Sequence, residues 1–327
     1  MHNLFHLGAD DVRRHLPGNT AIEALRRFHA GQSMPITDRQ VVRDRSPSTN
    51  TFASLTAWSP GRYIAVKLVG AFPGNPALPS PEPAVQGLVA LFDGTTGRPL
   101  MTCDGAALTQ VKTAADSALA AELLSRPDSS TLLLVGAGGL AAEFATAMRV
   151  VRPSINRILV WNRSGGRADA LAAALSETHC EAEAVSDLSA ALSEADIVSA
   201  LTMSETPIVL GREVKAGVHI DLVGSYLPEM REGDDELIRR SGRIYVDTLF
   251  DCRNSGDICQ PLASGALRDD MIAGDLFELC TAKTVGRRDD RDITLFKNIG
   301  GAHLDLVVAA ELYRSVLLQR NGSCNSG

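Results

Sequence analysis

Aromatic residues make up only 5% of this 327-residue chain, and its six cysteines are scattered rather than clustered. No apolar run reaches the roughly 18 residues of a membrane-spanning helix, and the glycine-rich segment 131–140 is too short to cross a bilayer. The cysteines and the seven histidines show no zinc-ligand spacing and no HExxH pair. A membrane partner, a disulfide framework and a metal centre are therefore not expected.

Basic residues are in the minority, with 32 Lys and Arg against 39 Asp and Glu and a formal net charge of −7. A nucleic-acid surface needs a clustered basic excess, so nucleic acid is not an expected partner. The first residues, MHNLFHLGADD, lack a basic region followed by an apolar core, which is the pattern of a signal peptide. These features predict a cytoplasmic protein with reduced thiols.

The length of the chain predicts two domains of ordinary size. Before residue 125 the pattern is mixed, with short alternating segments between two helical ones. Helices are expected over 10–30 and 106–124, and strands over 63–69, 87–92 and 99–103. This part of the chain is expected to be an α+β domain.

After residue 130 short apolar strands alternate with helical or turn segments. Strands are expected over 131–135, 157–161, 182–185, 197–201, 219–223 and 244–247, with helices over 140–151 and 167–176. Repeated βα units predict an α/β fold, here a Rossmann-type doubly wound parallel sheet. We assign this Rossmann domain to 121–293 and the α+β domain to 1–120, completed by 294–327 with a helix over 304–318.

The string GAGGLA at 136–141 follows the apolar segment LLLV and opens a helical segment. Gly136 permits a tight turn, and Gly138 lets the backbone approach a pyrophosphate at the helix N-terminus. The pattern indicates a dinucleotide site, and the alternative is a glycine turn in a ligand-free α/β sheet. The residues expected to bind the cofactor here are Gly136, Ala137, Gly138, Gly139 and Leu140.

The end of the second strand of such a domain selects between NAD and NADP. An NAD enzyme usually carries a carboxylate there, which accepts a hydrogen bond from the ribose 2′-hydroxyl. This strand ends in Trp-Asn-Arg-Ser instead. Asn162, Arg163, Ser164 and Arg167 are therefore expected to lie at the cofactor, with the cations on a 2′-phosphate. NADPH is the expected cofactor and NADH the alternative. The alternative for Arg163 is a solvent-facing residue that has no contact with the cofactor.

Several further segments occur in a characteristic order. They are AVKLVGAFPGN, FDGTTGRPL, LTQVKTAADSALAAELLSRP, VGAGG, WNRS, VHIDLVGSYLPEMREGDDEL and DITLFKNIGG. Together they resemble the ornithine cyclodeaminase/mu-crystallin family over nearly the whole chain, and within it the Δ1-pyrroline-2-carboxylate reductases. The resemblance implies a homodimer formed through the α+β domain, and a site for a small imino-acid substrate between the two domains.

The resemblance also assigns roles to individual residues. Arg39, Lys67 and Lys112 are implied to bind the substrate carboxylate, and Lys67 to be catalytic. Lys112 and Thr202 are further implied to contact the cofactor. Lys67 lies in the apolar segment IAVKLV, where a semi-buried ammonium could donate a proton. The alternative for each lysine is a surface residue with a buried stem.

Three positions depart from the family pattern. Lys112 stands where arginine is common, which keeps the charge but not the bidentate geometry. Val85 replaces a common histidine before Gln86. Tyr226, two residues after Gly224, replaces the aspartate that cyclodeaminases use in acid–base chemistry.

The expected function is therefore NADPH-dependent reduction of Δ1-pyrroline-2-carboxylate to L-proline, with Δ1-piperideine-2-carboxylate to L-pipecolate as a second reaction. Three alternatives stay open at this point. They are an NAD-dependent ornithine or lysine cyclodeaminase, a reductase of acyclic imines such as an alanine dehydrogenase of this family, and a non-catalytic binding protein of the mu-crystallin type.

Overall fold

The computed structural model describes residues 4–31, 33–45, 50–177 and 180–324. The chain divides into unit 1, Met1–Lys112 with Gly301–Gly327, and unit 2, Thr113–Gly300. We had placed the boundaries at 120/121 and 293/294. The first boundary in the structure lies inside helix α3 (Gly105–Leu124), and the second lies just before helix α10 (Ala302–Cys324).

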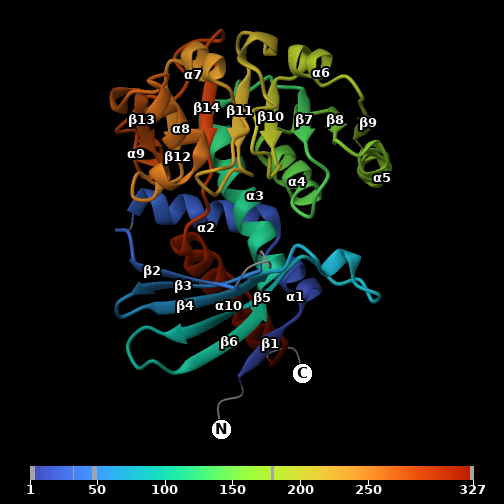
Figure 1. The fold of residues 1–327 in the computed structure, drawn as a ribbon. Helices are drawn as coiled ribbons and strands as arrows, with labels where there is room; N and C mark the ends of the chain where they lie inside the picture. Colours follow the sequence, from blue (N-terminus) through green and yellow to red (C-terminus); the bar gives the residue numbers. More distant parts are fainter. Residues whose placement is uncertain (1–3, 32, 46–49, 178–179, 325–327) are drawn as a thin grey trace. The chain divides into compact units, whose positions relative to one another are not determined.

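Unit 1 is built on a six-stranded sheet with the order β1-β6-β5-β4-β3-β2 (Figure 1). Its short first strand pairs parallel to β6, and all other neighbours are antiparallel. The strands are β1 (Phe5–Leu7), β2 (Ile36–Arg43), β3 (Thr51–Ser59), β4 (Tyr63–Ala71), β5 (Val85–Asp93) and β6 (Pro99–Asp104). A 3₁₀ turn, Asn75–Ala77, lies between β4 and β5.

Helix α10 packs against one face of this sheet, with contacts to β2, β3, β4 and β5. Side chains alternate between the two faces of a strand, so the odd-numbered residues of β3, β4 and β5 share this face. Its centre is apolar and fully buried: Ala57, Ala65, Val89 and Leu91. This buried face is also the one that carries the side chain of Lys67, as shown by its pairing with Val89.

The prediction of a single helix over 10–30 is wrong. The structure has two helices, α1 (Ala9–His15) and α2 (Gly18–Gly31). Leu16 leaves the helical region with φ −134° and ψ 62° because the ring of Pro17 disfavours helical backbone in the residue before it. The carbonyl of Pro17 then accepts from the amides of Thr20 and Ala21, which starts α2.

Unit 2 is an eight-stranded, entirely parallel sheet with the order β13-β12-β14-β11-β10-β7-β8-β9. Its strands are β7 (Thr131–Val135), β8 (Arg157–Trp161), β9 (Glu181–Ala184), β10 (Ile197–Ala200), β11 (His219–Leu222), β12 (Ile244–Val246), β13 (Ile272–Asp275) and β14 (Thr294–Lys297). The predicted α/β fold with a doubly wound parallel sheet is confirmed.

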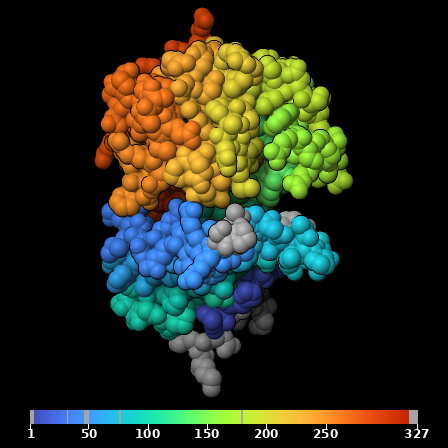
Figure 2. All heavy atoms as spheres, in the orientation of Figure 1, coloured from blue at the N-terminus to red at the C-terminus, as the bar shows by residue number. Residues whose placement is uncertain are grey.

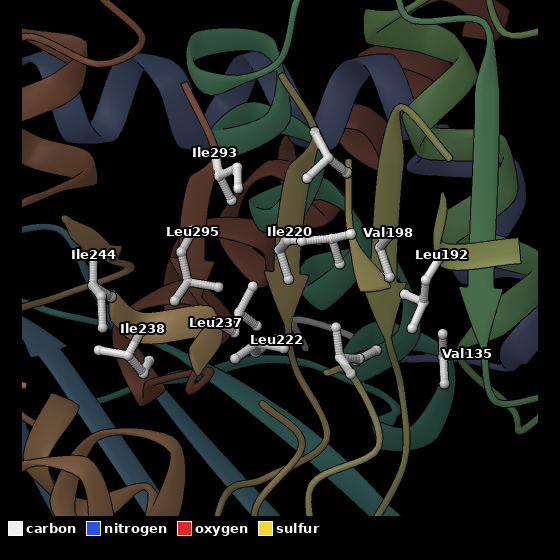
Figure 3. Close-up of a cluster of buried hydrophobic side chains, with 14 of the residues drawn as sticks. Val135, Leu192, Val198, Ile220, Leu222, Leu237, Ile238, Ile244, Ile293 and Leu295 are labelled. Atoms are coloured by element: carbon white, nitrogen blue, oxygen red, sulfur yellow. The ribbon is translucent and has the colours of Figure 1, made fainter. Parts of the chain in front are cut away.

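Helices connect these strands and pack on the sheet (Figure 1). They are α4 (Ala141–Val151), α5 (Gly165–Ser176), α6 (Leu188–Glu194), α7 (Asp235–Ser241), α8 (Gly256–Ser264) and α9 (Leu276–Cys280), with 3₁₀ turns at Gly211–Glu213, Cys252–Asn254 and Asp269–Met271. Between sheet and helices lies a continuous apolar core that includes Leu133, Val198, Ile220, Leu237 and Leu295 (Figure 3). Figure 2 shows the surface of this unit, in green through yellow to orange.

Two elements of this sheet were not expected. β13 was not predicted, and residues 294–300 were assigned to the α+β domain. Instead β14 lies between β11 and β12 and pairs with both. Its sequence is Thr-Leu-Phe-Lys. The polar residues at both ends mask the apolar pattern of a buried strand, although all four side chains are buried in the structure.

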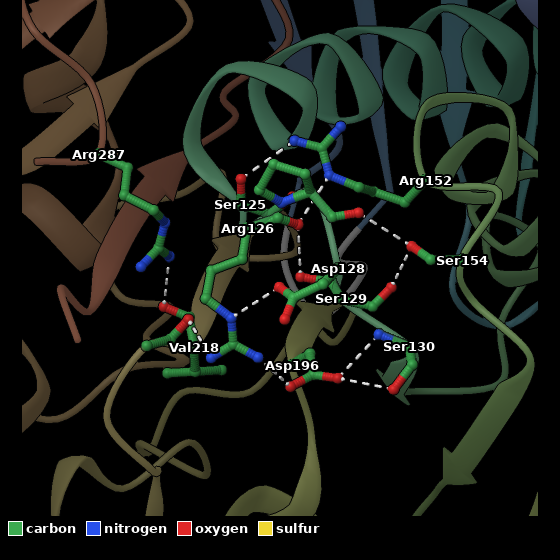
Figure 4. Close-up of polar contacts among 12 residues, drawn as sticks. Ser125, Arg126, Asp128, Ser129, Ser130, Arg152, Ser154, Asp196, Val218 and Arg287 are labelled. Carbon is green, nitrogen blue, oxygen red and sulfur yellow. Dashed lines mark hydrogen bonds and ion pairs between the residues drawn. The ribbon is translucent and has the colours of Figure 1, made fainter. Parts of the chain in front are cut away.

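Two arginines hold the C-terminal end of α3 in unit 2 (Figure 4). Arg152 donates to the carbonyls of Ala121, Glu122 and Ser125, and Arg287 donates to that of Leu124. These carbonyls lie at the end of the helix, where few intrahelical donors remain and where cations are favoured by the helix dipole. Within the described residues, no helix has both the length and the apolarity to cross a membrane.

Candidate functional site

The glycine turn after β7 has the shape of a phosphate-binding loop. Gly136 has φ +116°, and a Cβ there would lie 3.0 Å from the carbonyl oxygen of Leu201. Glycine is therefore required at this position. A Cβ on Gly138 would meet nothing within 4 Å, and Leu140, the N-cap of α4, makes no side-chain capping bond. The backbone here is open to a ligand that accepts from amides.

The same loop lies at the point where the strand order reverses. From β7 the chain proceeds through β8 and β9 on one side, and through β10 and β11 on the other. Open parallel sheets bind ligands outside the carboxyl ends of the strands at such a switch point. The turn, the helix start and the switch point all suit a dinucleotide, which supplies a hydride when bound.

The end of β8 is fixed to the glycine loop. Asn162 accepts from the amide of Ala137 at 3.2 Å and donates to the carbonyl of Ser164 at 3.0 Å. The next three candidates, Arg163, Ser164 and Arg167, are exposed. Neither arginine forms an ion pair with any other residue that the structure describes. Their charges are therefore available to an external anion.

Thr202 and Gly224 follow β10 and β11, and one carboxylate joins them. Oε1 of the fully buried Glu232 accepts from the Thr202 amide at 2.6 Å and from its hydroxyl at 2.8 Å. Oε2 accepts from the amides of Val223 at 3.1 Å and Gly224 at 2.7 Å. Burial raises the pKa of Glu232, and these donors oppose that rise by stabilising the carboxylate. Tyr226, two residues further on, is 39% exposed.

Further buried charges lie behind this carboxylate. Asp257 accepts from the backbone amide of Glu232 at 2.8 Å, and its other oxygen lies 3.3 Å from Nζ of Lys297. Nearby, Asp221 accepts from the hydroxyls of Ser117 and Ser199. Burial raises the pKa of Asp221 to about 7.

Unit 1 contains a separate group of candidate residues, a buried cluster of two lysines and one carboxylate. Nζ of Lys67 on β4 lies 2.9 Å from Oδ2 of Asp305 on α10, and Nζ of Lys112 on α3 lies 3.8 Å from Oδ1. All three residues are over nine-tenths buried. Buried cations of this kind need a paired anion, which Asp305 provides.

Arg39 lies on the same face of the sheet as Lys67. It pairs with Leu55, which in turn pairs with Lys67, and directly paired residues point to one face. With Leu55 on the strand between them, the two backbones are about 10 Å apart. Unlike the lysines, Arg39 is exposed and lies on the edge strand β2.

The structure thus brings Lys67 and Lys112 together, and places Arg39 on the same face of the sheet as Lys67. In unit 2 it gathers the glycine loop and Asn162, and ties Thr202 to Gly224. Asp305 and Glu232 were not predicted. A signal for Asp305 exists, since it is the one charged residue in the apolar run LDLVVAA and must have a partner if buried. Over the described ranges, no group of three potential ligands is placed to hold a metal ion.

Comparisons with known proteins find relatives over nearly the whole chain. Over 309 residues the chain is 40% identical to a Δ(1)-pyrroline-2-carboxylate reductase of Paracoccus denitrificans, covering 94% of this chain and 96% of that protein. The names of such relatives agree with the predicted enzyme class, a reductase of imines.

Two solved structures share the fold over almost the full length. One is the Thermococcus litoralis Δ(1)-pyrroline-2-carboxylate reductase in complex with NADH and L-proline, with TM-score 0.88, 28% identity, and coverage of 97% of this chain and 98% of that one. The other is an archaeal alanine dehydrogenase dimer with bound NAD, with TM-score 0.87, 25% identity, and coverage of 97% of each chain.

A family profile matches residues 12–319 of the chain. The match spans both units, including β4 with Lys67, the glycine loop and α10 with Asp305. The family predicted from the sequence motifs is therefore confirmed. The chain belongs to the ornithine cyclodeaminase/mu-crystallin family.

Proposed function

We propose that this protein is an NADPH-dependent reductase that converts Δ1-pyrroline-2-carboxylate to L-proline and Δ1-piperideine-2-carboxylate to L-pipecolate. The observation that carries the proposal is the buried cluster of Lys67, Lys112 and Asp305. The 40% identity to a protein named as such a reductase supports the choice of substrate.

The cluster suits a small substrate with a carboxylate beside an imine. Lys112 and Arg39 supply positive charge for the carboxylate, and Lys67 faces helix α10 from the same side of the sheet as Arg39. In the reaction the imine carbon gains a hydride and the nitrogen gains a proton. We assign to Lys67 the role of holding a proton at the nitrogen, where an ammonium stabilises the developing amine. Asp305 keeps the lysine in place through the short ion pair.

We assign the cofactor to the carboxyl edge of the sheet in unit 2. The glycine loop receives the pyrophosphate, and the exposed cations Arg163 and Arg167 receive the 2′-phosphate. Lys112 and Thr202 are proposed to contact the rest of the cofactor. The absence of a carboxylate at the end of β8 favours NADPH over NADH.

Tyr226 favours a reductase over a cyclodeaminase. Cyclisation of ornithine with release of ammonia needs a group that takes up and returns a proton at the amine. A tyrosine hydroxyl, which ordinarily ionises near pH 10, serves this purpose poorly compared with an aspartate. Reduction of an imine needs only one proton and one hydride.

The test is a substrate panel with the purified enzyme. Oxidation of NADPH and of NADH is followed with cyclic and acyclic imino acids, and ammonia and proline are measured after incubation with ornithine and NAD. We expect ready NADPH-dependent reduction of the cyclic imines and negligible ammonia from ornithine. Ammonia release at rates comparable to imine reduction would place the chain among cyclodeaminases. If none of the substrates is turned over, the result would favour a non-catalytic binding protein.

We also propose that two copies associate through the face of the six-stranded sheet opposite α10. This face exposes large apolar side chains on neighbouring strands: Val42 (69%), Phe52 (48%), Trp58 (41%) and Leu88 (39%). Large apolar side chains gathered on one exposed face mark surfaces at which proteins associate. The dimer named for the archaeal alanine dehydrogenase supports a second copy as the partner.

A further inference from the structure

Glu232 makes an unusual set of contacts for a residue outside regular secondary structure. Both of its carboxylate oxygens accept two hydrogen bonds, one pair from Thr202 and the other from Val223 and Gly224. Thr202 follows β10, and Gly224 follows β11, the neighbouring strand. One buried side chain therefore joins the two loops that leave the carboxyl edge side by side.

The two loops are also joined directly, because the carbonyl of Ala200 accepts from the amides of Val223 and Gly224. A Cβ on Gly224 would overlap the backbone carbonyl of Thr202, so the two backbones are in direct contact. Four donors converge on the carboxylate in a fully buried position, where charged hydrogen bonds are strongest and hardest to replace. Beyond the strand ends, each loop is thus held to one oxygen of Glu232.

The backbone of Glu232 is fixed in turn. Oδ1 of Asp257 accepts from the amides of Glu232 and Gly233, at 2.8 and 3.1 Å, while Oδ2 faces Lys297. The carbonyl of Glu232 accepts from the amides of Ile208 and Val209. The carboxylate is held from behind and presented to the two loops in one orientation.

The loops lie on the half of the sheet that receives the nicotinamide end of a dinucleotide. The first half, β7 to β9, carries the glycine loop and the adenosine-side residues, so β10 and β11 flank the other nucleotide. We propose, resting on the proposed function, that Glu232 is the positioning residue for the nicotinamide half of the cofactor. It sets the spacing of the Thr202 loop and the Gly224–Tyr226 loop and touches neither cofactor nor substrate.

The test separates this role from a general contribution to folding. Glu232→Asp keeps the charge beside Asp257 and Lys297 but draws the carboxylate back from the loops, and Glu232→Gln keeps one of the two oxygens. The matched control is Asp234→Asn, two residues away, whose side chain accepts from the amides of Gly211 and Leu237 and starts α7. Thermal unfolding is recorded for all of the variants.

Binding of NADPH and NADH is measured by fluorescence, and binding of the fragments 2′-phospho-ADP-ribose and ADP-ribose, which lack the nicotinamide, by calorimetry. We expect Glu232→Asp to raise the Kd of the dinucleotides roughly tenfold or more while the fragments bind within about twofold of wild type. Asp234→Asn should lower the unfolding temperature and leave every Kd unchanged.

An equal loss for dinucleotides and fragments, or no loss for either, would overturn the role of Glu232 and leave the proposed function intact. Wild-type protein that binds no dinucleotide would overturn both. If Glu232→Asp does not fold, Glu232→Gln, which keeps one of the two acceptor oxygens, takes its place with the same dinucleotides and fragments. Selective weakening of dinucleotide binding by about threefold is expected for that milder change.

Discussion

Nζ of Lys67 and Oδ2 of Asp305 are 2.9 Å apart, although the two residues are separated by 238 positions in the sequence. Because both side chains are buried, each is the main compensation for the charge of the other. In the proposed reaction the same ion pair would serve substrate chemistry and fold stability, so variants of Lys67 must be designed to separate the two effects.

Lys67→Met is expected to lower kcat/KM for imine reduction by about a hundredfold or more, because a positioned proton donor contributes on that scale. NADPH binding should stay near the wild-type value. Because Asp305 loses its nearer cation, the free energy of unfolding should fall, although Lys112, 3.8 Å from Oδ1, still pairs with Asp305. Lys67→Met/Asp305→Asn also takes the carboxylate from the buried Lys112, so neither stability nor turnover should return. The exposed Lys283→Met serves as control. A Lys67→Met enzyme with wild-type kcat/KM would show that the active site lies elsewhere.

Arg163→Ala is expected to raise the KM for NADPH roughly ten- to hundredfold, since one charge-assisted contact contributes about 1.5–3 kcal/mol. The KM for NADH should hardly change, because NADH lacks the 2′-phosphate. Arg212→Ala is the matched control, an exposed arginine that forms an ion pair with its neighbour Glu213. Steady-state kinetics with both cofactors decide the point, and equal effects on the two would refute the assignment of Arg163.

Val42→Glu is expected to separate the proposed dimer, because a charge buried without a partner in an interface costs several kcal/mol. The dissociation constant should rise roughly a hundredfold or more, as measured by light scattering over a dilution series. Val150→Glu, at a valine of α4 that is 42% exposed, should leave the oligomeric state unchanged. A wild-type protein that is monomeric at micromolar concentration contradicts the dimer.

Asp221→Asn is expected to alter the pH dependence of stability. Burial raises the folded-state pKa of Asp221 to about 7, whereas an unfolded aspartate titrates near 3.9. The wild type therefore loses stability as pH rises from about 4 to about 7, and Asn lacks this loss. Relative to wild type, the variant should gain about 2–4 kcal/mol between pH 4 and pH 8 in denaturant unfolding.

For Asp196→Asn, the change in the pH dependence of stability should have the opposite sign. Burial opposes ionisation of Asp196, but bonds from Lys215 and from the amides of Ser130 and Thr131 outweigh it and lower the pKa to about 2. Its stabilisation is present above the unfolded pKa and is lost as pH falls towards 2. The free energy of unfolding is measured against pH for both variants. For either aspartate, a difference between variant and wild type that is the same at every pH would contradict the prediction.

Local patterns were enough for the parallel sheet and its glycine turn, because β7 and α4 combine an apolar run, a turn and a helix within a short stretch. β3 was missed because its apolar residues, such as Phe52 and Trp58, lie partly exposed on an uncovered face. β14 was missed because Lys297 is polar in sequence yet buried opposite Asp257. The motifs led to Lys67 and Lys112, but Asp305 and Glu232 act through long-range contacts that no local window contains.

The place of β14 in the sheet also governs how this chain is assembled during synthesis. β12 is joined to β11 only through β14, so the sheet stays in two pieces until residues 294–297 have left the ribosome. Unit 1 waits longer still, because α10, which covers its sheet and supplies Asp305, is made last. Both lysines are thus synthesised nearly 200 or more residues before their carboxylate, and the nascent chain carries an open sheet face throughout that interval. A chaperone that shields this face would act on the protein before the cluster of Lys67, Lys112 and Asp305 is complete.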